Sequence, residues 1–523
     1  MRAHLIGPSL TRALAPSLLE ALNDGPQDSP WLIFHLGQRR TESSRADVLA
    51  RSRGWAAAFR ARGVRSGDAV LMVFPNGLEF VTAFFGAQLC GAVPVPVVWP
   101  AGFYADPAKA LEATAWQRSV VEPTAIACTA DFESVFSNAV TCPIDADSTP
   151  NSRPTADDPA FLQFTSGTEG SPRAIVITHR AAVHSATAMA QCLDLGPDDV
   201  GVSWLPLFHD MGLVGSLLTS LVAGFPLHVM TPAEFLLHPE HWLRTLSEAK
   251  ATITVAPNFA YDYAKRRIRS TESIDLRSLR FALNGSEAVQ RATIEGFETR
   301  FSACGLAAGT IRPVYGLAEA TLGVAFELDR SPDHTVDDRP VPSVGQPLAG
   351  MEASVRDTSE AEAADLEEGE IWVRGPSVAS EHLLGPGRRA AALKDGWLRT
   401  GDRGLKREGR LHVTGREKDL IIRGGRKYPP YELERVAAQI ANASPSGALA
   451  VGSFDPKLGT EALIIVVECP EGRRDEVRLT LPGRLVAELG IRPDRVEFVD
   501  PGSLPRTSSG KLRRSAWLEE TRA

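Results

Sequence analysis

The 523-residue sequence has few cysteines and no long apolar run. No Cys-x-x-Cys pair is present, which argues against a zinc ribbon or a disulfide-stapled fold and favours free thiols. No stretch approaches the roughly 20 apolar residues that cross a bilayer. The apolar character of residues 1–22 is interrupted by Pro8, Arg12, Pro16 and Glu20, unlike a secretory signal, so we expect a surface segment and a first helix there. Together these absences predict a cytoplasmic protein without a membrane span.

Positive charge is also not in excess. The chain carries 56 Lys and Arg against 64 Asp and Glu, a formal net charge of −8, so no overall basic surface suggests a nucleic-acid partner. Hydrophobic residues make up 43% and charged residues 23%, which is ordinary for globular proteins with large cores. At roughly 100–200 residues per domain, the length predicts two to four packed units.

Helical and strand patterns alternate along the first two thirds of the chain. Residues 45–62 and 77–90 have helical spacing and flank an apolar strand at 69–74. A second alternating region runs from 160 to 326, opening with the strand at 160–164. Alternation of this kind predicts an α/β fold with two doubly wound, mostly parallel layers.

Beyond residue 343 the pattern changes. Short β segments punctuated by glycine, such as 370–373 and 410–413, indicate a β-rich subdomain. A helix at 430–442 and a strand at 463–467 then suggest a separate small α+β domain. We therefore expect a large N-terminal domain of three subdomains at 1–416 and a small, mobile C-terminal domain at 417–523.

The segment Thr165–Arg173 follows a predicted strand and combines hydroxyls, glycines and a terminal cation, as a polyphosphate-binding loop requires. It is not the P-loop of the NTPases, because G-x-x-x-x-G-K-[ST] is absent and residues 174–177 form another predicted strand. Alone, such a loop is more often a simple turn. Its candidate phosphate-binding residues are Thr165, Ser166, Gly167, Thr168 and Gly170.

Further motifs occur downstream in a fixed order. They are Trp204–Gly212, Asn284–Glu287, Tyr315–Thr321, Thr400–Asp402, Gly415–Arg416 and Ser509–Lys511. With the loop at 165–173 they resemble the adenylate-forming superfamily of acyl-CoA synthetases, peptide-synthetase adenylation domains and luciferases. The resemblance spans nearly the whole chain and implies ATP or an acyl-AMP, Mg²⁺ and a carboxylic acid as ligands.

The chemistry of these residue types agrees with the resemblance. Tyr315 offers a flat ring for a purine, and Glu319 offers a hard oxygen ligand for Mg²⁺. Asp402 can accept both ribose hydroxyls, and Arg416 can donate to ribose or phosphate. Any one of them alone would be typical of a solvated turn.

The resemblance assigns further roles. Nucleotide binding falls on the two motifs that contain Asn284, Gly285, Ser286, Glu287, Tyr315, Gly316 and Thr321. Lys511 would be the catalytic lysine that bridges carboxylate and phosphate oxygens, with Glu319 as the metal ligand. The C-terminal domain would rotate between the two half-reactions about Lys418.

Within the superfamily, residues 205–212, 257–262 and 315–321 look like those of fatty acyl-AMP ligases. The aspartate with which amino-acid-activating domains hold the substrate amine aligns with His209, a further candidate catalytic residue. An amino-acid substrate is therefore disfavoured and an apolar acid favoured.

Two features point instead to CoA ligases. The stretch 325–344 is short for the insertion of the acyl-AMP ligases, and Gly424 and Gly425 resemble the glycine turn that lines the pantetheine tunnel. We therefore expect an acyl-CoA ligase with coenzyme A as acceptor. The alternatives are an acyl-AMP ligase that loads an acyl carrier protein, and a pseudoenzyme that binds nucleotide or acid.

The phosphate loop departs from the family pattern at three positions. Glu169 stands in place of threonine, Arg173 in place of lysine and Ala174 in place of glycine. A carboxylate 4 Å from a phosphate charge is repelled by about 4 kcal/mol at an effective dielectric near 20. This predicts weak or lost adenylation, so that the protein mainly thioesterifies an acyl-adenylate supplied by another enzyme. The alternative is that Glu169 points into water and Arg173 replaces lysine.

Overall fold

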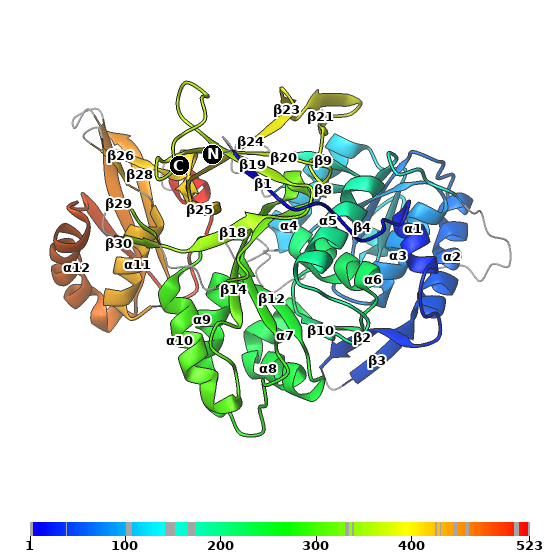
Figure 1. Cartoon of the computed structure of the whole chain (residues 1–523), viewed down its shortest axis with the longest axis horizontal. Helices are drawn as coiled ribbons and strands as arrows, with labels where there is room; N and C mark the ends of the chain where they lie inside the picture. The colour runs from blue at the N-terminus through cyan, green and yellow to red at the C-terminus, as the bar shows by residue number, and fades with distance from the viewer. Residues whose placement is uncertain are drawn as a thin grey trace.

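The computed structural model describes residues 4–37, 39–100, 107–141, 152–165, 173–329, 334–336, 339–423, 426–428, 430–443, 447–455, 460–506 and 512–520. A large body contains the N-terminal four fifths of the chain, and a smaller orange-to-red part lies at its side (Figure 1). This agrees with the predicted α/β fold with a large N-terminal and a small C-terminal part.

A parallel sheet forms the centre of the large body. Its strand order is β2 (Pro30–Leu36), β11 (Leu227–Val229), β10 (Gly201–Ser203), β12 (Ile253–Pro257), β13 (Phe281–Gly285) and β14 (Ile311–Leu317), all parallel. Helices α7 (Pro232–Leu237), α8 (Pro239–Glu248), α9 (Asn258–Arg267) and α10 (Arg291–Phe301) connect strands of this sheet (Figure 1). Parallel strands need such crossovers, so the predicted second doubly wound layer is confirmed.

The β-rich subdomain continues the same sheet rather than standing apart from it. Next to β14 lie β15 (Leu322–Phe326), β18 (Ser343–Pro347), β25 (Arg410–Arg416), β24 (Trp397–Arg407), β20 (Gly369–Arg374) and β19 (Glu352–Arg356), each antiparallel to its neighbour. The motif at 315–321 is therefore placed where parallel pairing changes to antiparallel pairing.

The first predicted layer is a separate parallel sheet with the order β5 (Val93–Pro96), β4 (Ala69–Val73), β6 (Ala125–Cys128), β7 (Ala139–Val140). Helices α2 (Arg45–Ala61) and α3 (Leu78–Leu89) pack against each other beside it. A capping box between Ser44 and Asp47 begins α2. Its start is therefore encoded locally.

One strand does not lie where the sequence pattern puts it. We expected 160–164 to open the second parallel layer, but β8 (Pro159–Phe164) pairs antiparallel with β9 (Ala174–Thr178). β9 in turn pairs with β21 (Glu381–Gly385), about 200 residues later, which pairs with β22 (Arg388–Ala391). Such a long-range partner leaves no periodic signal in the local sequence.

The N-terminal segment has the expected surface stretch followed by a first helix. β1 (Leu5–Ile6) pairs with β19, and α1 (Leu18–Asn23) buries Leu18, Leu19 and Leu22 in the main core. The first helix is thus anchored in the core, whereas the described residues before Ser17 are exposed or partly buried.

The C-terminal part has its own hydrophobic cores. Two hydrophobic clusters are built only from residues beyond 420. They are enclosed by α11 (Pro430–Ala441), α12 (Arg474–Leu489) and the strands β28 (Ala448–Asp455), β29 (Thr460–Glu468) and β30 (Arg495–Val499). Helix α4 (Pro107–Val121), in contrast, belongs to the first layer. The expected helix and strand in the C-terminal part are confirmed, and the boundary at 416/417 remains a prediction.

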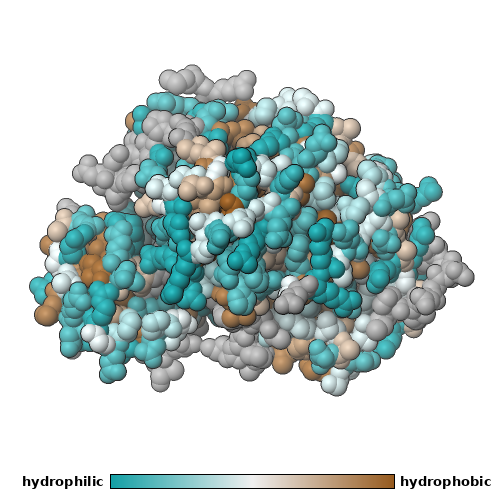
Figure 2. Space-filling view, turned by 90° about the horizontal axis from the view of Figure 1, so that it is seen from below, coloured by the Kyte–Doolittle hydropathy of each residue, from teal (hydrophilic) through white to brown (hydrophobic). Residues whose placement is uncertain are grey.

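Two expectations from composition can be compared with the structure. Of the six cysteines, the five that are described are free thiols, as predicted. Among the described helices, none is both long and apolar enough to cross a membrane. The face in Figure 2 is mostly hydrophilic, with hydrophobic residues in small separate groups.

Candidate active site

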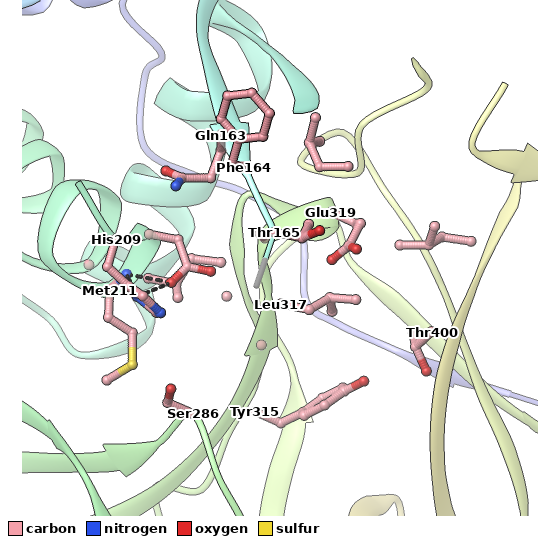
Figure 3. Close-up of a pocket in the computed structure, with 18 of the residues that line it drawn as sticks. Gln163, Phe164, Thr165, His209, Met211, Ser286, Tyr315, Leu317, Glu319 and Thr400 are labelled. Atoms are coloured by element: carbon pink, nitrogen blue, oxygen red, sulfur yellow. Dashed lines mark hydrogen bonds and ion pairs between the residues drawn. The ribbon is translucent and has the colours of Figure 1, made fainter. Parts of the chain in front are cut away.

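A cavity of about 660 Å³ lies where these sheets meet. It is lined by residues from β8, β9, β14, β15 and β24 and by those at 208–211 and 315–319. Figure 3 shows His209, Met211, Ser286, Tyr315, Glu319 and Thr400 around this common space, although they come from elements far apart in the sequence. The structure thus brings residues of several predicted motifs together.

Tyr315, Asp402 and Arg416 form a hydrogen-bonded chain at one wall. The Tyr315 hydroxyl donates to Oδ2 of Asp402 at 2.7 Å, and Nε of Arg416 donates to Oδ1 at 2.9 Å. Burial and Asp402 raise the pKa of Tyr315, so it remains a phenol that donates. The charge of Asp402 raises the pKa of Arg416. Tyr315 and Arg416 line the cavity.

Glu319 lies on the short helix η4 (Ala318–Ala320) after β14 and lines the cavity. Burial raises the pKa of its carboxyl, and Asp210 and Asp402 raise it further, against the opposing effect of Arg416. Its side chain is partly buried at the cavity, and a carboxylate supplies the oxygen ligand that Mg²⁺ prefers. Glu319 therefore fits the predicted Mg²⁺ ligand by its chemistry, and its role as a metal ligand stays a prediction.

His209 and Asp210 face the cavity from the beginning of η2 (Met211–Leu218), a π-helix. Nδ1 of His209 lies 2.6 Å from Oδ1 of Asp210, which also accepts the Met211 N–H at 2.7 Å. Gly212 is required by sterics, because a Cβ there would lie 2.1 Å from the Pro206 carbonyl oxygen. The Asp210 contact fixes the imidazole in the wall, with Nε2 as its other nitrogen.

An apolar compartment extends from the polar wall. Its lining side chains come from α5 (His179–Cys192) and the residue that follows it, from η2 and from the strands β12 to β15; they include Met189, Leu193, Met211, Ile253, Val255, Leu283, Val314, Leu317, Leu322 and Phe326. Gly215 of η2 and Gly323 of β15 also line it. Sequence reasoning did not find these residues, since they are scattered over 140 positions. The available signal was the glycine pattern of 212 and 215 within an apolar helix.

The ends of the phosphate loop lie at the cavity. The Thr165 N–H donates to the Arg173 carbonyl oxygen at 3.0 Å, and the Arg173 N–H donates to Oγ1 of Thr165 at 3.2 Å. Both residues line the cavity. The predicted residues between them, Ser166, Gly167, Thr168, Glu169 and Gly170, lie outside the described residues.

Not every predicted nucleotide-binding residue lines the cavity. Asn284 is fully buried, with its Nδ2 donating to Oδ1 of Asn258 at 3.2 Å. Glu287 accepts the Phe259 N–H at 2.6 Å, and Thr321 donates to the Ser377 carbonyl oxygen at 2.6 Å. These contacts hold backbone segments together. Ser286 and Gly316, in contrast, line the cavity, whereas Gly285 does not.

The remaining predictions concern the C-terminal part. Gly424, Gly425 and Lys511 lie outside the described residues. Lys418 lies in the short helix η5 (Glu417–Asp419), directly after Arg416, and only its backbone is described. Its role as a hinge stays a prediction.

Comparison with known proteins decides the family. The AMP-binding enzyme family matches residues 19–383. The chain belongs to this family and is an adenylate-forming ligase. It is 32% identical to the long-chain-fatty-acid–AMP ligase FadD28 of Mycobacterium tuberculosis, over 87% of this chain and 88% of that protein.

Two more relatives agree. The medium-chain-fatty-acid–[acyl-carrier-protein] ligase TtuA of Teredinibacter turnerae is 32% identical over 70% of this chain and 63% of its own length. A solved structure from work on fatty acyl-adenylate ligases of E. coli and L. pneumophila superimposes with a TM-score of 0.87 at 28% identity, covering 97% of this chain and 98% of that one. The fold and the ATP- or acyl-AMP-using class are thereby established.

Proposed function

We propose that this adenylate-forming ligase converts a largely apolar carboxylic acid to its CoA thioester through an acyl-AMP. The observation that carries the proposal is the single cavity with a polar wall of Tyr315, Glu319 and Arg416 and an apolar compartment beyond His209. An acyl-adenylate has the same two halves, a charged nucleotide and an apolar chain. The fatty-acid names of the relatives support an apolar acid.

Two steps account for the product. In the first, a carboxylate oxygen of the acid attacks the α-phosphorus of ATP, the bond to the bridging oxygen breaks, and pyrophosphate leaves. Arg173 and Arg416 line the cavity and can donate to phosphate oxygens. By resemblance, Lys511 approaches from the C-terminal part. Mg²⁺ bound by Glu319 would neutralise phosphate charge.

In the second step, a thiol sulfur attacks the acyl carbonyl carbon, its proton is released, and the carbon–oxygen bond to AMP breaks. Rotation of the C-terminal domain about Lys418 would move Lys511 away from the cavity. It would bring Gly424 and Gly425 to the cavity, so that the thiol can enter past them. His209, in contact with Asp210, lines the same cavity, and we propose that it lies near the acyl carbonyl group.

The acceptor is supported by the short connection between β15 and β18. Phe326 ends β15 and Ser343 begins β18, with only the small hairpin of β16 (His334–Val336) and β17 (Arg339–Val341) described between them. This leaves no room for the insertion expected of acyl-AMP ligases. The second candidate acceptor is a carrier-protein phosphopantetheine, favoured by the similarity to TtuA, an acyl-carrier-protein ligase.

The phosphate loop supports the idea that the adenylation half-reaction is weak. Arg173, at the end of the sequence motif that contains Glu169, lines the cavity. In that case the acyl-adenylate is delivered by a separate enzyme.

The test compares acids and acceptors. Pyrophosphate exchange with ATP is measured over acids of two to sixteen carbons, and thioester formation from supplied acyl-AMP is measured with CoA and with a holo acyl carrier protein. We expect a preference for long acids and for CoA. Thioester formation with the carrier protein alone would select the second candidate, and no turnover in any assay would indicate a pseudoenzyme.

A further inference from the structure

A group of histidines and glutamates lies at the junction of α7 and α8, outside the catalytic cavity. One ring nitrogen each of His238 and His241 and one carboxylate oxygen of Glu240 lie within 4.8 Å of one another. Nδ1 of His238 is 3.7 Å from Oε1 of Glu240, and the two imidazole centroids are 5.1 Å apart. Ligand atoms around a tetrahedral zinc ion with bonds of about 2.0–2.1 Å are roughly 3.3 Å apart. Small side-chain rotations would therefore complete a coordination site.

The backbone under this group is fixed. The His238 N–H donates to the Glu234 carbonyl oxygen at 2.8 Å, and the His241 N–H donates to the His238 carbonyl oxygen at 2.9 Å. Pro239 occupies the first turn of α8 and restricts the backbone between the two histidines. The side chain of the adjacent Trp242 is fully buried. The candidate ligands thus project from a rigid helix junction, as metal ligands require.

Glu234 supplies a second, independent observation. Its side chain is 10% exposed, and Oε1 lies 3.3 Å from Nδ1 of His241. Its other oxygen, Oε2, is buried without a hydrogen-bond partner among the described residues. A buried carboxylate that accepts from one imidazole nitrogen orients the other nitrogen toward a metal, and the positive charge of the ion would stabilise the carboxylate.

We propose that His238, Glu240 and His241 bind a transition-metal dication of the Zn²⁺ class, with Glu234 as a positioning residue. Two imidazoles and one carboxylate suit Zn²⁺, Co²⁺ or Ni²⁺ better than Mg²⁺ or Ca²⁺, which prefer oxygen ligands alone. The side chains of His238, Glu240 and His241 are 56%, 35% and 40% exposed. An ion therefore has access to them, and a water molecule can serve as its fourth ligand.

The site would tie the end of α7 to the first turn of α8. These helices cover the second hydrophobic core, in which Phe235 stacks on Trp204 with ring centroids 4.0 Å apart. The bound ion is therefore expected to stabilise this part of the fold and to have no part in the ligase chemistry.

Zinc binding is measured on the full-length protein after chelator dialysis, by titration against a chromophoric zinc chelator. We expect one saturable site with a dissociation constant in the micromolar range, and a loss of affinity of at least tenfold in His241→Ala and in His238→Ala. Glu248→Gln, an exposed carboxylate on the same helix, is the matched control and should bind like the wild type. Zinc should raise the Tm of the wild type and of Glu248→Gln, and should leave the Tm of His238→Ala and of His241→Ala unchanged.

Co²⁺ reports on the role of Glu234. The wild-type complex should show d–d absorption of low-coordinate cobalt, and Glu234→Gln should shift that band and weaken affinity by roughly tenfold. An unchanged band and affinity would contradict the positioning role. Equal zinc affinity in the His238→Ala/His241→Ala double variant, or no saturable wild-type binding below about 1 mM, would overturn the site itself.

Discussion

The hydroxyl of Tyr315 donates to Oδ2 of Asp402 at 2.7 Å, while Arg416 holds the other oxygen of the same carboxylate. Both oxygens of the predicted ribose acceptor are thus used to fix its orientation. Asp402 is itself buried and does not line the cavity, so in this structure it orients Tyr315 and Arg416, which do, and its role as ribose acceptor stays a prediction. The Tyr315–Asp402 pair connects β14 to β24 across the nucleotide wall.

Tyr315→Phe should weaken nucleotide binding without unfolding the protein. The change keeps the ring in the cavity wall but removes a hydrogen bond to a charged group, which contributes roughly 1.5–3 kcal/mol. We expect the affinity for a non-hydrolysable acyl-AMP analogue, measured by calorimetry, to fall about tenfold or more. The control is Tyr263→Phe, which removes a hydroxyl that donates to the Leu236 carbonyl oxygen at 2.6 Å, away from the cavity. Equal affinities in the two variants would contradict the proposed role of the pair.

Gly215→Leu should shorten the acids that the enzyme accepts. Gly215 lines the apolar compartment, and a Cβ at this position would already lie 2.8 Å from Cδ2 of Leu322. A leucine side chain would fill space that a long acyl chain needs. We expect kcat/KM for acids of twelve or more carbons to fall at least tenfold, and that for acids of four carbons to change little. An unaltered chain-length profile would mean that the acid does not occupy this compartment.

Restoring the family pattern in the phosphate loop should improve adenylation. Glu169→Thr with Arg173→Lys removes a negative charge and replaces a planar guanidinium with a compact ammonium. We expect tighter apparent ATP affinity and faster pyrophosphate exchange. Thioester formation from supplied acyl-AMP should stay the same, because that half-reaction contains no β- or γ-phosphate. Rapid exchange in the wild type that the double variant does not improve would refute the repulsion.

Lys511→Ala should separate the two half-reactions. By resemblance this cation serves only the pose in which the acid attacks ATP. We predict a loss of at least hundredfold in pyrophosphate exchange and a much smaller loss in thioester formation from acyl-AMP. Equal losses in both assays would show that the lysine is needed throughout, or for folding.

Buried histidine should make the fold sensitive to acid. Burial lowers the pKa of His179 from 6.5 to about 4, and its Nδ1 accepts the Leu18 N–H at 3.1 Å. Between pH 6.5 and 4 the unfolded chain binds a proton that the folded protein does not, so the free energy of unfolding falls as pH is lowered. This one group contributes roughly 3 kcal/mol over that window. Urea unfolding of His179→Gln should show a correspondingly weaker dependence on pH, and an identical slope would contradict the assignment.

Residue types at short spacing singled out Tyr315, Glu319 and Arg173 in the sequence. The structure places all three at one cavity, and their roles in binding stay predictions. The pairing of β9 with β21 could not be predicted, because His382 and Ile175, which face each other across it, are about 200 residues apart.

The apolar compartment escaped sequence reasoning for a related reason. Met189, Gly215 and Leu322 meet only after helix and sheet packing, and each is an ordinary core residue in its own segment. The two hydrogen bonds that fix Asp402 were likewise invisible, since its partners lie 87 and 14 positions away.

The central claim is that the cavity passes an acyl group from AMP to a thiol. Dodecanoyl-AMP and CoA are supplied to the active, zinc-free protein without ATP, and the products are quantified by mass spectrometry. Protein inactivated by heat is the control. We expect dodecanoyl-CoA and AMP in equal amounts from the active protein, and neither product from the heat-inactivated protein. Release of AMP without any thioester, with CoA and with a holo acyl carrier protein alike, would contradict it.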